Sequence, residues 1–146
     1  MIAVDTNVLI YAHRAEAELH GEAARALVAL AEGSAPWGLP IFCVVEFLRV
    51  VTHRRVFNPP STLAQAVGFL EGLVASPSCR IVLPSPGFLE LLTATARQAD
   101  ARGNLMFDVQ IAALCREHGI SAILTNDRDF ARFEGLEARY LGRAGA

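Results

Sequence analysis

The chain has 146 residues, of which 53% are hydrophobic and 19% charged, a balance typical of a folded globular protein and not of a disordered one. Its length predicts a single domain over residues 1–146 with a substantial core. The formal net charge of -2 excludes a strongly basic nucleic-acid-binding surface, although it does not exclude a local basic patch. All 13 basic residues are arginine, so chemistry that requires a lysine is excluded.

The three cysteines, Cys43, Cys79 and Cys115, are widely spaced and form no Cys-x-x-Cys pair. This arrangement is typical of reduced thiols in a cytoplasmic protein and not of a disulfide framework or a zinc site. The N-terminus has no basic leader, and no apolar stretch approaches the roughly 20 residues of a membrane span. We therefore expect a cytoplasmic protein with no membrane association.

The chain opens on a short apolar run, Ile2–Val4, of the kind that forms a strand covered on both faces. Asp5 follows directly, and residues 8–14 can form a helix with Asp5, Thr6 or Asn7 as its N-cap. In α/β sheets, ligands bind at the edge formed by the carboxyl ends of the strands, so Asp5 is a candidate site residue. Helix capping alone would also explain an aspartate at this position.

Helices alternate with short strands along the rest of the chain. The expected helices cover residues 18–32, 41–53, 63–74, 88–102 and 106–118, and the expected strands cover 35–39, 80–83, 120–124 and 138–141. Pro36 and Pro40 bound the strand at 35–39, so we expect this strand at the edge of the sheet. The alternation predicts an α/β fold with three layers, α/β/α, around a central and mainly parallel sheet.

Four acidic residues fall where this topology can bring them together. Asp5 and Asp127 follow strands whose carboxyl ends share one edge, Asp108 lies in the first turn of a helix, and Glu46 interrupts an apolar helix. A carboxylate in such surroundings is costly unless it is paired or binds a cation. Plainer explanations exist: an ion pair with Arg49 for Glu46, a helix N-terminus for Asp108 and an Asx turn for Asp127.

A group of carboxylates with no His or Cys partner at motif spacing favours Mg²⁺ or Mn²⁺ over Zn²⁺. Such ions suit phosphoryl chemistry, because they lower the pKa of a bound water and shield phosphate charge. Other phosphate-handling folds fit less well. A receiver domain requires a lysine, a haloacid-dehalogenase-type phosphatase requires an aspartate where Asn7 stands, and the chain has no Gly-rich phosphate loop.

In four segments the sequence resembles the PIN-domain nucleases, in particular the VapC toxin ribonucleases of type II toxin–antitoxin pairs. The segments are Ile-Ala-Val-Asp5-Thr-Asn-Val-Leu-Ile-Tyr-Ala, Val-Val-Glu46-Phe-Leu, Phe-Asp108-Val-Gln-Ile-Ala-Ala and Ile-Leu-Thr125-Asn126-Asp127-Arg-Asp129-Phe130. The resemblance implies a PIN-like fold and endonucleolytic cleavage of RNA by metal-activated water, leaving 5′-phosphate and 3′-hydroxyl ends. It also implies a cognate antitoxin whose C-terminal segment occupies the active-site groove.

The resemblance also implies roles for individual residues. The acidic metal-binding and catalytic quartet would be Asp5, Glu46, Asp108 and Asp127, with Asp129 as a further candidate for a supporting role or a second ion. The groups that orient these acids would be Thr6, Asn7, Thr125 and Asn126. Two departures from the family pattern bear on substrate fit and remove no ligand: Val109-Gln110 stands where a small residue usually follows the third acid, and no Ser or Thr directly precedes Glu46.

Candidates for RNA contact are arginines and histidines, because arginine suits phosphate. One cluster at the end of the Glu46 helix consists of Arg49, His53, Arg54 and Arg55, and a second candidate is the pair His13 and Arg14. A solvated helix end would explain the cluster equally well. The apolar helix around residues 42–51 and the habit of the family predict a homodimer. The alternative to an enzyme is a non-catalytic PIN domain that binds RNA or a partner, and the intact quartet argues against it.

Overall fold

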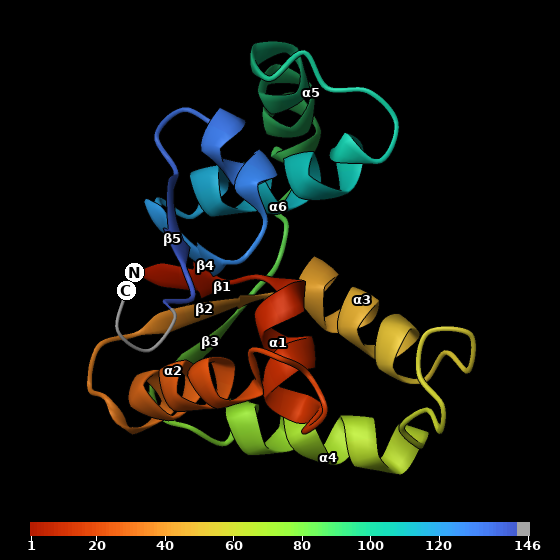
Figure 1. Cartoon of the computed structure of the whole chain (residues 1–146). Coiled ribbons are helices and arrows are strands. Elements are labelled where there is room, and N and C mark those ends of the chain that lie inside the picture. Colours follow the sequence, from red (N-terminus) through yellow and green to blue (C-terminus); the bar gives the residue numbers. More distant parts are fainter. Residues whose placement is uncertain (143–146) are drawn as a thin grey trace.

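A computed structural model describes residues 1–142 as a five-stranded parallel sheet covered by helices (Figure 1). The strands are β1 (Ile2–Val4), β2 (Trp37–Pro40), β3 (Cys79–Val82), β4 (Ala122–Thr125) and β5 (Glu137–Tyr140). Their order in the sheet is β3-β2-β1-β4-β5, and every neighbouring pair is parallel. The predicted α/β fold with a parallel sheet is confirmed.

Helices cover both faces of the sheet. They are α1 (Thr6–His13), α2 (His20–Glu32), α3 (Ile41–Val51), α4 (Leu63–Val74), α5 (Phe88–Gln98) and α6 (Leu105–Glu117), with a short 3₁₀ helix, η1 (Arg128–Arg132). In Figure 1, α1, α2 and α4 lie on one side of the sheet, and α5 and α6 lie on the other. Sheet and helices form the three predicted layers.

The direction of winding reverses between β1 and β4. From β1 the chain proceeds outward to β2 and β3, and it then returns through α5 and α6 to β4 on the other side of β1. The register of β1 and β4 aligns Val4 with Leu124, and the Asp5 amide donates to the Leu124 carbonyl at 2.9 Å. Such a reversal opens a crevice at the carboxyl ends of the two strands, where ligands bind in folds of this kind.

The core explains the apolar character of α3. Cys43, Phe47 and Val51 on this helix are buried in the same apolar cluster as Trp37, whereas Val45 is 61% exposed. Packing within the chain therefore accounts for one whole side of the helix. Across residues 1–142, no helix has the length and apolar character to cross a membrane.

Two sequence-based predictions were wrong, one about the position of a strand in the sheet and one about the end of a helix. β2 is an interior strand between β3 and β1, although we expected it at the edge. The sheet tolerates Pro40 because it is the last residue of the strand and the N-cap position of α3. Proline lacks an N–H, and none is required at this position. Helix α5 ends at Gln98 and not at residue 102, because Asp100 adopts a positive φ of 47° and the Ala101 amide bonds back to the Ala96 carbonyl.

Candidate active site

Asp5 is positioned by the end of β1 and the start of α1. Its carboxylate accepts a hydrogen bond of 2.7 Å from the Thr6 amide, as an N-cap does, and another of 2.7 Å from the Thr125 hydroxyl. The side chain is 5% exposed. Asp5 therefore does cap α1, but capping engages only the carboxylate oxygen that accepts from the Thr6 amide. The other oxygen is oriented by Thr125, which lies 120 positions later in the chain.

Thr125 connects the end of β1 to the loop after β4. Its buried hydroxyl donates to Asp5 and accepts from the Asp127 amide at 2.9 Å. The same loop is tied to α1 by the Asn126 amide, which donates to the Asn7 side-chain oxygen at 3.3 Å. Asn7 and Thr125 thus hold this loop through their side chains, whereas Asn126 contributes its backbone amide, and the orienting roles that the resemblance implies stay a prediction.

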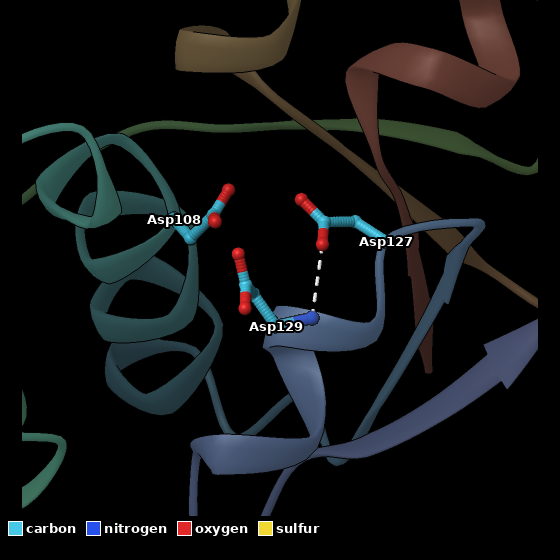
Figure 2. Close-up of side chains that lie close together, drawn as sticks. All are labelled: Asp108, Asp127 and Asp129. Carbon is cyan, nitrogen blue, oxygen red and sulfur yellow. Dashed lines mark hydrogen bonds between the residues drawn. The ribbon is translucent and has the colours of Figure 1, made fainter.

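Three aspartates converge above this loop (Figure 2). Asp108, from the first turn of α6, and Asp127 and Asp129, from the start of η1, each offer one carboxylate oxygen, and these oxygens lie within 4.8 Å of one another. The Asp129 amide donates to the Asp127 carboxylate at 2.9 Å, which is the contact that an Asx turn at Asp127 predicts. The Arg132 Nε atom lies 3.6 Å from the exposed Asp129 carboxylate. An exposed ion pair of this kind neutralises little charge in water.

Glu46 reaches toward the same edge from α3. It accepts from the Thr6 hydroxyl at 3.2 Å, so Thr6 links it to the residue adjacent to Asp5. The Arg49 guanidinium lies 3.9 Å from the other carboxylate oxygen, a long contact between two partly exposed groups. An exposed ion pair of this geometry stabilises little, so it does not account for the position of Glu46.

The pKa values of two acids report the crowding of negative charge. Burial raises the pKa of Asp108 to about 7, with further contributions from Asp127, Asp5, Asp129 and Glu46. Burial raises the pKa of Asp5 to about 6, against the lowering effect of its two hydrogen bonds and with added repulsion from Glu46 and Asp127. The other four acids thus all act electrostatically on Asp108, and the oxygens of Asp108, Asp127 and Asp129 lie within 4.8 Å of one another.

The donor set fits a hard divalent cation. Ligand oxygens around one Mg²⁺, Mn²⁺ or Ca²⁺ ion lie about 2.0–2.6 Å from the metal, hence at most about 4–5 Å from each other. The three aspartate oxygens already satisfy this limit, and the group contains carboxylates alone, without the thiolate or imidazole that would favour zinc. A cation would also relieve the repulsion that raises the pKa of Asp108.

Comparisons with known proteins agree with this architecture. The family model described as PIN domain matches residues 2–136. The chain belongs to the PIN-domain family. Relatives named as ribonucleases are similar to this PIN domain over nearly their whole length. VapC ribonuclease Mb2897 of Mycobacterium bovis is 37% identical over 140 residues, which cover 96% of this chain and 95% of the relative. Ribonuclease VapC25 of Mycobacterium tuberculosis is 37% identical over 136 residues, covering 93% and 95%.

Solved structures share the fold of this PIN domain. VapBC2 from Rickettsia felis, bound to a promoter DNA fragment, superposes with a TM-score of 0.71 at 17% identity, covering 97% of this chain and 100% of that chain. Mycobacterium tuberculosis VapC20, described as a sarcin-ricin loop cleaving toxin, superposes with a TM-score of 0.68 at 20% identity, covering 94% and 99%. At these identities the likeness concerns the fold alone.

The residues expected to contact RNA are not all placed near the acids of this PIN domain. Arg49 is one helical turn from Glu46, whereas His53, Arg54 and Arg55 lie exposed in the turn after α3. Arg14 is occupied by contacts within the protein: it donates to Ser61, to the Pro59 carbonyl and to Glu16, and it stacks on the Phe57 ring. His13 likewise contacts Ser61 and two phenylalanine rings. These contacts favour a structural role for both residues.

The sequence does not reveal a pocket that adjoins Glu46 in the structure. Residues on α3 and α6 line it, among them Phe42 and Phe107. Both phenylalanines fit the apolar pattern of their helices, so the pattern alone does not separate them from core residues. The sequence offers one signal, which is that Phe107 directly precedes Asp108; the structure adds that the Phe107 side chain is 57% exposed.

Proposed function

We propose that this PIN-domain protein is a metal-dependent endoribonuclease, the toxin of a type II toxin–antitoxin pair, which hydrolyses RNA phosphodiester bonds. The observation that carries the proposal is the convergence of Asp108, Asp127 and Asp129 at the edge where β1 and β4 end, with their oxygens within 4.8 Å. The VapC ribonuclease relatives, at 37% identity over nearly the whole chain, support the same activity.

The residues that would hold Mg²⁺ or Mn²⁺ are Asp5, Glu46, Asp108 and Asp127, with Asp129 as an additional ligand. When bound, such an ion lowers the pKa of a water molecule and shields the phosphate charge. Thr125 orients Asp5 and Asp127 through one hydroxyl, and Thr6 orients Glu46. Asp108, whose pKa is raised to about 7, would give up its proton on binding a cation.

We also infer that the partners are an RNA substrate and a cognate antitoxin protein in the cytoplasm. Support for an antitoxin comes from solved neighbours that are VapBC complexes, such as that from Salmonella typhimurium, with a TM-score of 0.62. Cys43, Cys79 and Cys115 are unpaired thiols, which suits a reducing compartment.

The homodimer stays a prediction. The dimer was predicted from the apolar helix around residues 42–51, but the core of the same chain covers much of that helix. Light scattering at micromolar concentration decides the matter, because a dimer has twice the 15.7 kDa mass of one chain.

Cleavage of total RNA by the purified protein tests the proposed function, with Mn²⁺, with Mg²⁺ and with chelator. We expect fragments only with metal, and none from Asp5→Asn, which keeps the shape of the side chain and loses a charge. A non-catalytic scaffold is the competing function, and RNA binding without cleavage under all metal conditions would establish it. Cleavage by Asp5→Asn at the rate of the parent would contradict the role of Asp5 as a ligand.

A further inference from the structure

A pocket of about 330 Å³ lies between α3 and α6, beside the acidic site. Its lining consists of Phe42, Val45, Glu46 and Arg49 from α3, and Phe107 and Gln110 from α6. The volume lies within the range of about 300–1,000 Å³ that is typical of sites for small organic groups. Glu46 belongs both to this lining and to the proposed metal ligands, so the two sites are continuous.

The apolar part of the pocket is formed by hydrophobic side chains that are exposed to solvent. Phe107 is 57% exposed and Val45 is 61% exposed, on the two facing helices. Phe42 is half-buried, and its ring is supported from behind by Phe88, with the ring centroids 5.7 Å apart. Two aromatic side chains that flank a slot next to a phosphodiester site offer flat surfaces on which a nucleobase can stack.

The polar part of the pocket has unused hydrogen-bonding capacity. Gln110 is half-buried, and within the described part of the chain its carboxamide has no hydrogen-bond partner. A carboxamide presents a donor and an acceptor side by side, which matches the edge of a base. The Arg49 side chain is 64% exposed and has only the 3.9 Å contact with Glu46 among residues 1–142, which leaves its guanidinium free to meet a phosphate.

We infer that this pocket binds the nucleobase next to the scissile phosphate, with the ring stacked on Phe107, the base edge contacted by Gln110, and a flanking phosphate contacted by Arg49. The inference rests on the proposed function and names a determinant of its substrate preference. Asp108 lies between Phe107 and Gln110 in the sequence, so the helix that supplies a metal ligand also supplies the base contacts.

The test is the cleavage, with Mn²⁺, of an RNA library containing a randomised stretch, followed by sequencing of the cut ends. The parent should show a base preference at one position beside the cut. Phe107→Ala and Gln110→Ala should flatten the preference at that position, and Phe107→Trp should keep it. The matched control is Leu63→Ala on α4, where an equally exposed side chain (65%) lies outside the pocket, and it should reproduce the parental profile.

A second measurement uses a fluorescein-labelled RNA that carries the preferred sequence, and a copy in which the preferred base is replaced by an abasic site. In chelator, the parent should bind the abasic RNA about 5- to 100-fold more weakly than the intact RNA, the range expected for one stacked base. Phe107→Ala should bind both RNAs equally. If the parent does not cleave the library, no preferred sequence is known, and the binding of homo-oligonucleotides of A, C, G and U is measured in place of the intact and abasic RNAs.

The outcomes separate the two proposals. A parent that binds RNA with base selectivity that Phe107→Ala removes, yet never cleaves, retains the base pocket and overturns the nuclease. A parent that cleaves with the same base profile as Phe107→Ala and Gln110→Ala overturns the base pocket alone. If Phe107→Ala converts a dimer to a monomer without changing the base profile, the pocket is an interface between two copies of the chain and the inference fails.

Discussion

The two ends of α6 carry acidic side chains in opposite electrostatic states. Asp108 lies in the first turn, where the helix dipole favours a negative charge, yet its pKa is raised to about 7. Glu117 lies in the last turn, where the dipole disfavours a negative charge, yet its pKa is lowered, because the Ser85 side chain and amide donate to it at 2.6 and 2.8 Å. The immediate neighbours therefore outweigh the dipole at both ends.

The difference separates a structural carboxylate from one held ready for a ligand. Glu117 has donors from its own chain and stabilises the fold in its charged form. Asp108 has four other acids as neighbours and, among the described residues, no donor from a basic side chain, so the chain offers its charged form little beyond the helix dipole. A divalent cation would supply the missing partner.

The largest expected effect follows from removing a ligand at the acidic end. Asp127→Asn should lower RNA cleavage at least about 100-fold, since even the supporting residues of metal sites typically contribute 10- to 100-fold. In chelator its melting temperature should equal or exceed that of the parent, because one repelling charge is gone. Glu117→Gln is the matched control at the other end of α6, and it should cleave at the parental rate. A fully active Asp127→Asn would break the comparison.

Thr125→Val should have the next largest effect. The hydroxyl orients the Asp5 carboxylate and accepts from the Asp127 amide, and this partly buried amide would lose its partner. We expect about 1–3 kcal/mol of lost stability and about 10- to 100-fold slower cleavage. Thr125→Ser keeps the hydroxyl and should recover most of the activity, which a purely packing role for Thr125 does not predict.

The pH dependence of stability in chelator should reveal the acidic end directly. The pKa of Asp5 is about 6 and that of Asp108 about 7 in the folded state, above 3.8 for an unfolded aspartate. The folded state therefore binds more protons between these values, and stability falls as the pH rises from about 4 to about 7. The contribution of Asp5 amounts to about 3 kcal/mol at most.

Thermal melting in chelator at several pH values between 4.5 and 8 checks this dependence, and Asp108→Asn should flatten it. Stability that rises with pH through this range would show that partners within the chain stabilise the charged carboxylates, and the contrast between Asp108 and Glu117 would be lost.

The smallest effect is expected for Glu117→Gln on stability. The lowered pKa means that the charged form contributes stability at neutral pH, and this contribution is lost as the pH falls below the ordinary value of 4.5. The variant should melt slightly below the parent at pH 7, and the difference should shrink as the pH falls below 4.5. Equal melting at pH 7 would remove Glu117 from the comparison while leaving the acidic site untouched.

Much of the fold could be predicted because its signals are local. The apolar run before Asp5 and the run before Asp127 predict two buried strands, and parallel topology then brings their carboxyl ends together. The proline rule failed for β2, because it concerns the interior of a strand and Pro40 is the last residue of its strand. Asp100 ends α5 in a left-handed conformation that glycine more often adopts, so no strong signal marks that boundary.

The site was predicted less completely, since its geometry depends on how separate helices meet. Asp129 belongs to the tightest group of oxygens, because the short η1 helix turns it back toward Asp108, whereas the family resemblance offered it only as a further candidate beside the quartet. The pocket that includes Phe107 and Gln110 requires α3 and α6 to lie side by side, which is a property of the packed molecule and not of either helix.

Calorimetric titration of the protein with Mn²⁺ tests the central claim most directly. The raised pKa values of Asp108 and Asp5 mean that a bound cation would displace protons, so binding at pH 6.5 should release protons, visible as a binding heat that depends on the ionisation enthalpy of the buffer. Release should disappear near pH 8.5, where Asp108 and Asp5 are already charged, and Asp108→Asn should bind more weakly with less release. Mn²⁺ binding without proton release at pH 6.5, or binding unchanged in Asp108→Asn, would contradict a metal site built from these carboxylates.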